Sequence, residues 1–153
     1  MNAILTDYAT KLKPFDKNLL LENCVNDLRT VESTETFTTT QPVRFVHYTR
    51  SPASLINILK YGLSPRICVE TNTNSVWMVA LNEATKQEYD KHCCVAFDIP
   101  AGDRRLHIEN KDTATYWEVI PTEWFVSINF PIGAMGMNPI YTSNFGWIAG
   151  NQL

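Results

Sequence analysis

The sequence lacks a block of lysine and arginine residues, and it lacks a long apolar run. A protein that coats duplex DNA needs such a basic block to neutralise phosphates, and a membrane-spanning helix needs about 20 apolar residues in succession. The first residues also lack the basic segment and apolar core of a secretory signal. We therefore expect a cytoplasmic protein without a membrane segment. A net charge of −3 still leaves room for a local basic pocket that holds one nucleotide.

The cysteines form no motif typical of a metal site or a disulfide framework. They are Cys24, Cys68, Cys93 and Cys94. Their spacing matches neither C-x-x-C nor a paired zinc pattern, and two adjacent cysteines are poorly placed for ordinary disulfides. The three histidines, His47, His92 and His107, add no zinc motif. We expect the thiols to be small buried hydrophobes in a reducing compartment, with no metal bound.

What the chain does contain is the material of one globular domain. It has 153 residues, of which 44% are hydrophobic and 11% are aromatic, enough for a substantial core. Apolar residues recur at helical spacing over 17–31, and a polar, threonine-rich loop follows. We predict an α+β fold with a helical extension over 1–40, a core over 43–130 and a glycine-rich, apolar tail over 131–153.

The segment "VRFVHYTRSPASLINILKYGLSPR", residues 43–66, has the clearest local pattern. Its alternating, β-branched start predicts a strand over 43–48. An N-cap at Ser51, Pro52 at the first helical position and Gly62 at the end predict a helix between them. Side chains alternate along a strand, so His47 and Thr49 are expected on one side of the sheet and Tyr48 on the other.

The second half of the chain is rich in short strand patterns. We predict a short polar helix over 82–92 and strands over 75–81, 93–100, 104–109, 116–121 and 124–130. Glu118 and Glu123 lie beside these strand ends and form a carboxylate pair of the kind that performs acid–base chemistry. Taken alone, they are more typical of surface charges that face solvent at a strand end. Cysteine–histidine catalysis is not expected of His92 and Cys93, because adjacent strand residues point to opposite faces.

The order of these features resembles the ADP-ribosyltransferase superfamily, whose members use NAD. In the branch of poly-ADP-ribose polymerases and tRNA 2′-phosphotransferases, the first core strand ends in His-Gly-Thr or a relative, and a helix ending in Gly-Leu or Gly-Phe follows. Here "HYT" and "LINILKYGL" occupy those positions. The DNA-modifying ADP-ribosyltransferase toxins of bacteria are more similar still, and "WEVIPTEWFVSI" resembles their late glutamate and "P-x-E-W" segment. The resemblance covers residues 43–128.

The resemblance implies a split mixed or antiparallel sheet and a set of site residues. Glu118 would be the catalytic residue, which holds a ribose hydroxyl, stabilises the cation and orients the acceptor. His47 and Thr49 would contact the dinucleotide, and the backbone of Tyr48 would bind the nicotinamide amide. Tyr48 stands where the polymerase branch has glycine.

The remaining implied contacts are to the pyrophosphate and the nicotinamide ring. Arg66 would pair with the pyrophosphate, with Arg50 as the alternative. Trp77 is the nearest aromatic residue to the second-strand tyrosine of the polymerase branch and would stack on nicotinamide, with Tyr116 as the alternative. Core packing is the competing interpretation of Trp77.

The function implied by the resemblance is mono-ADP-ribosylation of a protein or a nucleic-acid base, by a bacterial or phage toxin, defence or counter-defence factor. The alternative is a catalytically inactive module on the same fold, which holds a nucleotide or blocks a partner protein. In that case the apolar tail over 131–153 would be an interaction surface. NAD hydrolysis and tRNA 2′-phosphate transfer rank last, because the latter calls for more basic residues around an RNA phosphate.

Overall fold

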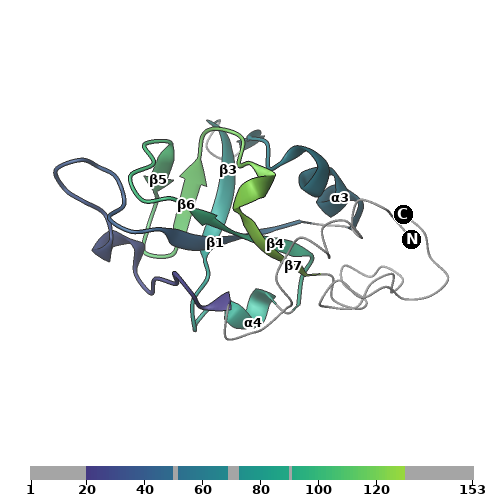
Figure 1. The fold of residues 1–153 in the computed structure, drawn as a ribbon, viewed down its shortest axis with the longest axis horizontal. Coiled ribbons are helices and arrows are strands. Elements are labelled where there is room, and N and C mark those ends of the chain that lie inside the picture. The colour runs from purple at the N-terminus through teal and green to yellow at the C-terminus, as the bar shows by residue number, and fades with distance from the viewer. Residues whose placement is uncertain (1–19, 50–51, 69–72, 90, 130–153) are drawn as a thin grey trace.

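The computed structural model describes residues 20–49, 52–68, 73–89 and 91–129 (Figure 1). Most of the predicted core over 43–130 is therefore visible, and it has the expected α+β composition. The predicted tail over 131–153 and the first part of the N-terminal extension lie outside the described residues.

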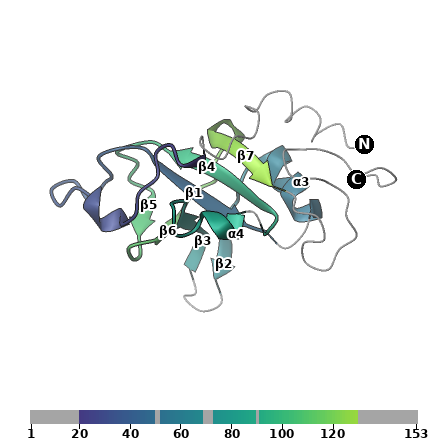
Figure 2. The ribbon, with the colours of Figure 1, turned by 90° about the horizontal axis from the view of Figure 1, so that it is seen from below.

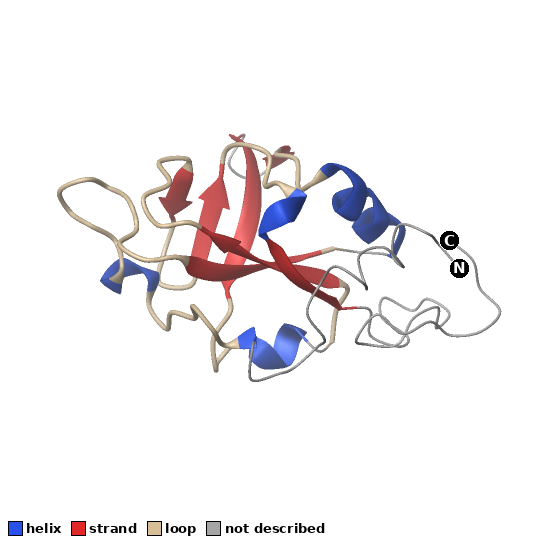
Figure 3. Ribbon diagram, in the orientation of Figure 1, coloured by secondary structure: helices blue, strands red, loops and turns tan. Residues whose placement is uncertain are grey.

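Antiparallel strands form the body of the protein (Figure 3). The strand order is β5-β6-β3-β1-β4-β7, and β2 pairs with β3 outside this path. The strands are β1 (Val43–Tyr48), β2 (Arg66–Cys68), β3 (Thr73–Ala80), β4 (Cys94–Ile99), β5 (Leu106–Ile108), β6 (Thr113–Tyr116) and β7 (Phe125–Asn129). The helical elements are η1 (Leu28–Thr30), α3 (Pro52–Tyr61), α4 (Lys86–Tyr89) and η2 (Thr122–Trp124).

The two faces of the sheet carry separate hydrophobic clusters, with α3 and α4 on opposite sides (Figures 1 and 2). Phe45 of β1 packs in the cluster that also contains Leu55 and Leu59 of α3. Its neighbour Val46 packs in the other cluster, with Tyr89 of α4. This alternation is what a two-sided buried strand requires. Each such side chain contributes about 1.5–3 kcal/mol when it is fully buried.

The predicted strand over 43–48 and the helix that ends at Gly62 are confirmed. Gly62 has φ +85, a conformation that side chains disfavour. A Cβ atom added to Gly62 would lie 2.6 Å from the carbonyl oxygen of Ile120. This close approach accompanies a two-way backbone bridge between Leu63 and Ile120, with N–O distances of 3.0 and 2.9 Å. The glycine therefore ends α3 and lets the chain after β6 pack against it.

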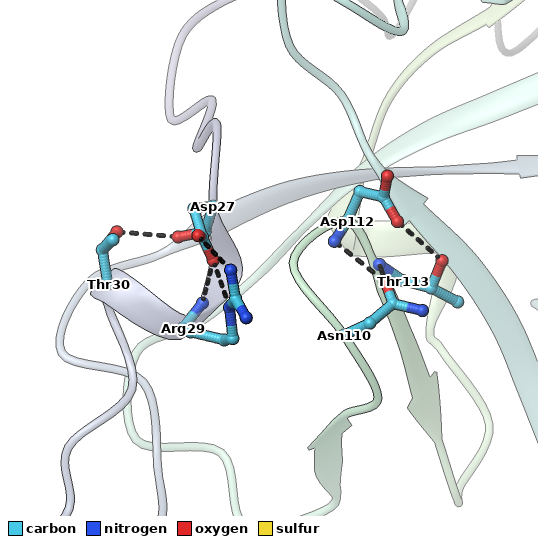
Figure 4. A network of polar contacts seen from close by, with 6 residues as sticks. All are labelled: Asp27, Arg29, Thr30, Asn110, Asp112 and Thr113. Atoms are coloured by element: carbon cyan, nitrogen blue, oxygen red, sulfur yellow. Dashed lines mark hydrogen bonds and ion pairs between the residues drawn. The ribbon is translucent and has the colours of Figure 1, made fainter.

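The predicted helix over 17–31 is wrong beyond Leu20, the one described residue of that range in an α-helix. Turns lead into the 3-10 helix η1 instead, and Asn23 has φ 55. The carbonyl of Asn23 accepts from the Arg44 amide at 3.0 Å, which ties the segment to β1. Asp27 caps η1 by accepting from the Arg29 amide at 3.0 Å (Figure 4). Leu28 is fully buried, so this apolar position faces the core without a continuous helix.

The strand predicted over 116–121 is also wrong, because the observed strand spans Thr113–Tyr116 and shares only Tyr116 with that range. The strand is β6, which ends at Tyr116, and residues 117–119 form an exposed bend. The Trp117 amide still donates to Arg105 at 3.2 Å, and then the chain turns so that Ile120 reaches Leu63. The turn before β6 is built by Asn110, whose side-chain oxygen accepts from the Thr113 amide at 2.8 Å (Figure 4).

Candidate ligand-binding cleft

The strands β1 and β3 are neighbours at one end only. Their register contains two pairs, Phe45 with Ala80 and Val46 with Val79. Beyond these pairs the strands run at a steep angle to one another (Figures 1 and 3), and the start of β3 pairs with β2. The last residues of β1 and the first residues of β3 therefore stand apart within one continuous sheet.

A cavity of about 470 Å³ lies at this separation. The end of β1 contributes His47, Tyr48 and Thr49, and the start of β3 contributes Ser75, Val76 and Trp77. One side of α3 and the turn after it complete the lining, through Ser54, Asn57, Ile58, Tyr61, Gly62, Leu63 and Ser64. The volume lies within the range of about 300–1,000 Å³ typical of small-molecule sites.

His47 bridges the two separated strands through its ring. Its Nδ1 lies 2.8 Å from the carbonyl oxygen of Trp77. A carbonyl oxygen only accepts, so Nδ1 carries a hydrogen and donates it. This bond lies beyond the last register pair, where no backbone ladder joins β1 to β3. His47 thus helps to fix the width of the cleft as well as lining it.

Tyr48 contributes to the lining, but its ring belongs to the opposite face of the sheet. The ring packs against the cluster of Val46 and Cys94 and lies edge-on to the ring of His92, with centroids 5.5 Å apart. Burial raises the pKa of the Tyr48 phenol well above its usual value, as do the nearby Cys94 and Glu88. The phenol is therefore neutral at physiological pH. The expected alternation of His47 and Tyr48 is confirmed.

Trp77 lines the cleft from the face that Tyr48 occupies. Its neighbours Val76 and Met78 point into the cluster beneath α3, so alternation directs Trp77 the other way. The indole Nε1 is buried and has no hydrogen-bond partner. Ser75, two residues earlier on the same face, is 4% exposed and its Oγ also has no partner. Ser75 was not predicted as a site residue, although its position two residues before Trp77 on one strand indicates that both side chains share a face.

Glu118 does not line the cavity. It lies in the exposed bend after β6, where the following residues Val119 and Ile120 approach Gly62, which does line it. The antiparallel order β6-β3-β1 brings the end of β1, the start of β3 and the end of β6 to one end of the sheet. Glu118 thus shares this end with His47 and Trp77 while standing outside the cavity that they line.

Of the two arginines considered for the pyrophosphate, the structure describes only the backbone of Arg66. The backbone of Arg66 belongs to β2 and pairs with Ser75, at the edge of the cleft. The side chain of Arg66 and the whole of Arg50 lie outside the described residues. Glu123, the other member of the predicted carboxylate pair, lies exposed in η2 and does not line the cavity.

A different carboxylate, that of Asp103 in the turn before β5, is bonded to Tyr116 at the end of β6. Its side chain is 6% exposed and accepts from the Tyr116 hydroxyl at 2.7 Å and from Arg105 at 2.9 and 3.0 Å. Burial raises the pKa of Asp103, but the hydrogen bonds from Arg105 and Tyr116 outweigh it and hold the pKa below its usual value. Asp103 is thus an ionised structural anchor for β6.

A second cavity, of about 560 Å³, lies between the loop after η1 and strand β5. Its lining includes Glu35, Phe37 and Arg104. Phe37 is 78% exposed and has φ 56. None of the site residues expected from the sequence lines this cavity, so it is separate from the cleft between β1 and β3.

The thiols and histidines of the described chain do not assemble into a metal site. No group of three or more His, Cys, Asp or Glu side chains is arranged for metal binding among the residues that the structure describes. Burial raises the pKa of Cys93 to about 11, so this thiol is protonated at neutral pH and is not a nucleophile. Within the same residues, no helix combines the length and apolar character needed to cross a bilayer.

Comparison of the chain with protein-family models, with curated proteins and with solved structures finds no match.

Proposed function

We propose that the protein is an NAD-dependent mono-ADP-ribosyltransferase that holds NAD in the cleft between β1 and β3. The observation that carries the proposal is the placement of His47, Trp77 and Glu118 on three adjacent strands, or just beyond them, at one end of the sheet. The cleft has the size of a small-molecule site, and its described lining supplies hydroxyls, an imidazole and aromatic rings.

The proposed reaction breaks the bond between the nicotinamide nitrogen and the ribose. Nicotinamide leaves as a neutral molecule with the bonding electron pair, and positive charge develops on the ribose. A nucleophile of the acceptor then forms a bond to the same ribose carbon and loses its proton. Stabilisation of such a transition state requires fixed negative charge beside the ribose. Glu118 is the residue proposed to supply it and to orient the acceptor.

The remaining roles follow the positions of the side chains. His47 and Thr49 lie on the α3 side of β1 and are proposed to contact ribose hydroxyls, while the backbone of Tyr48 binds the amide of nicotinamide. Trp77 lines the opening from the other face, and Arg66 on β2 is proposed for the pyrophosphate. The acceptor is a protein side chain or a nucleic-acid base in the cytoplasm of a bacterial cell, where the protein acts as a toxin, defence or counter-defence factor.

The test is release of nicotinamide from NAD by the purified protein, alone and with bacterial lysate as a source of acceptor. Glu118→Gln keeps the shape of the side chain and removes its charge, so we expect release to fall by about 100-fold or more. Glu123→Gln is the matched control, because Glu123 is also exposed and lies in the same connection. Equal losses in the two variants, or full release by Glu118→Gln, would contradict the assignment.

The second candidate is a non-catalytic module that binds NAD or a related nucleotide in the same cleft. The observation that favours it is the exposed position of Glu118 outside the cavity lining. Such a module would bind NAD, as measured by calorimetry, and release no nicotinamide under any condition. In that case the segment 131–153 is the proposed surface for the protein partner.

A further inference from the structure

One face of α3 is turned toward the cleft between β1 and β3. Four of its side chains line the cavity, and they recur at the i, i+3, i+4 and i+7 spacing that places residues on one helical face. They are Ser54, Asn57, Ile58 and Tyr61. The neighbouring stripe of the helix, formed by Leu55 and Leu59, is buried in the core. The helix therefore separates a core face from a mostly polar face that meets water or a ligand.

Tyr61 leaves most of its surface uncovered in the free protein. It is 65% exposed, and among the exposed large hydrophobic residues of the described chain it alone lines this cavity. Lys60 Nζ lies 5.2 Å from the centroid of the Tyr61 ring, and Lys60 does not line the cavity. The ammonium group thus covers the ring from outside the cleft, and the side of the ring toward the cavity is open. An open aromatic face is stabilised when a planar ring stacks on it.

Asn57 stands one turn before Tyr61 on the same face of α3. Four residues along a helix correspond to a rise of about 6 Å, so the two side chains are neighbours along the cavity wall. Asn57 is exposed, and its amide is therefore accessible to a ligand in the cavity. The amide offers donors beside an acceptor. A planar ring stacked on Tyr61 can turn a polar edge toward Asn57 and pair with both.

We infer that Asn57 and Tyr61 form the subsite for the adenine ring of the ligand. Adenine presents an amino donor beside a ring-nitrogen acceptor, a pattern that an asparagine amide pairs with through two hydrogen bonds. The amide of nicotinamide also carries a donor and an acceptor, but the proposed function assigns that amide to the backbone of Tyr48. Adenine is the ring that remains for α3. The identity of the ligand as NAD rests on the proposed function, whereas the subsite rests on the open ring and amide on one face of α3.

Removal of the Tyr61 ring should weaken the binding of AMP, a probe that carries adenine without nicotinamide. We expect Tyr61→Ala to raise the Kd for AMP by about 5- to 100-fold, the range typical of a base stacked on an aromatic side chain. Tyr61→Phe keeps the ring and should bind AMP as wild type does. Phe37→Ala is the matched control, because Phe37 is an exposed aromatic residue outside the cleft. It should also bind as wild type does, and urea midpoints check that every variant is folded.

Asn57→Leu removes the amide and keeps the approximate size of the side chain. IMP carries a carbonyl oxygen where AMP has its amino group, so IMP lacks the donor that the Asn57 carbonyl accepts. We expect wild type to bind AMP about 5- to 100-fold more tightly than IMP, and we expect Asn57→Leu to bind the two nucleotides alike. A residue that only supports the fold would change both affinities by the same factor, so the ratio of the two affinities reports direct contact.

Calorimetric titration with AMP, IMP and nicotinamide mononucleotide decides the assignment. The subsite is overturned if Tyr61→Ala binds AMP as wild type does, if the preference for AMP survives in Asn57→Leu, or if wild type binds no AMP. Losses confined to nicotinamide mononucleotide would overturn the assignment to adenine and place nicotinamide on α3.

Nicotinamide release from NAD tests the transferase separately. If AMP binding depends on Asn57 and Tyr61 while wild type releases no nicotinamide, the transferase is contradicted and the subsite is supported. Release of nicotinamide by a wild type that binds no AMP would have the opposite meaning.

Discussion

The two ends of the β1–β3 pair differ in what satisfies their polar groups. At the paired end, Arg44 makes a two-pronged ion pair with Asp98 at 2.7 and 2.8 Å, with the Arg44 side chain only 6% exposed. Asn82, just after β3, donates to the Val25 carbonyl at 3.0 Å and accepts from the Ala84 amide at 2.9 Å. At the separated end, Ser75 and Trp77 leave donors unpaired.

This difference assigns different tasks to the two ends. The paired end uses buried polar groups to hold the chain segments around β1 together, and such networks stabilise a fold only when every member is satisfied. The separated end carries a cavity, a bridging histidine and unpaired donors, at some cost in stability. Costs of this kind are expected at functional sites.

The largest effect on stability is expected at Gly62, which ends α3 and lines the cavity at the separated end. In the Gly62→Ala variant, the new residue must adopt φ +85, and its Cβ lies against the Ile120 carbonyl oxygen. Gly102→Ala is the matched control, because Gly102 has φ +78 and no atom within 4 Å of the added Cβ. We expect Gly62→Ala to lower the free energy of unfolding by about 1–3 kcal/mol more than Gly102→Ala does.

Urea unfolding of the two glycine variants measures this difference. Equal losses would mean that the backbone conformation alone matters at Gly62. The contact between the end of α3 and the chain after β6 would then contribute little to stability.

A smaller effect, dependent on pH, is expected at Asp103. The folded pKa of Asp103 lies below its usual 3.8, so its stabilising contribution is present above that value and is lost as the pH falls through the folded pKa. Tyr116→Phe removes one donor and moves the folded pKa back toward 3.8. We expect a loss of about 1–2 kcal/mol at pH 7 that shrinks as the pH falls below about 4.

The measurement is the free energy of unfolding of wild type and Tyr116→Phe from neutral to acid pH. A difference that stays constant with pH would show that the lost hydroxyl acts through packing and not through the Asp103 carboxylate. Asp103 is a buried carboxylate with its hydrogen bonds satisfied, whereas Glu118 is exposed.

Local patterns with a direct physical cause were predictable from the sequence. The alternation of side chains over 43–48 predicted β1, and Pro52 and Gly62 predicted where α3 begins and ends. The helix over 17–31 failed because Val25, Leu28 and Val31 are buried by turns that fold onto the sheet, and burial alone imitates helical spacing.

The site was predictable in part for a similar reason. His47, Tyr48 and Thr49 lie together because they are consecutive at the end of β1, and Trp77 joins them through the fold. The exposed position of Glu118 depends on where β6 ends, and the missing partner of Ser75 depends on the separation of two strands. Neither is encoded in a local pattern.

We propose that the separated end of the β1–β3 pair is the end that binds the ligand. The most direct measurement is amide chemical-shift mapping of the isotope-labelled protein during titration with NAD. We expect the shifts to concentrate at residues 47–49, 54–64 and 75–77, while residues 43–46 and 79–82 at the paired end stay unchanged. Shifts confined to the paired end or to the cavity beside Phe37, or no shifts at all, would contradict it.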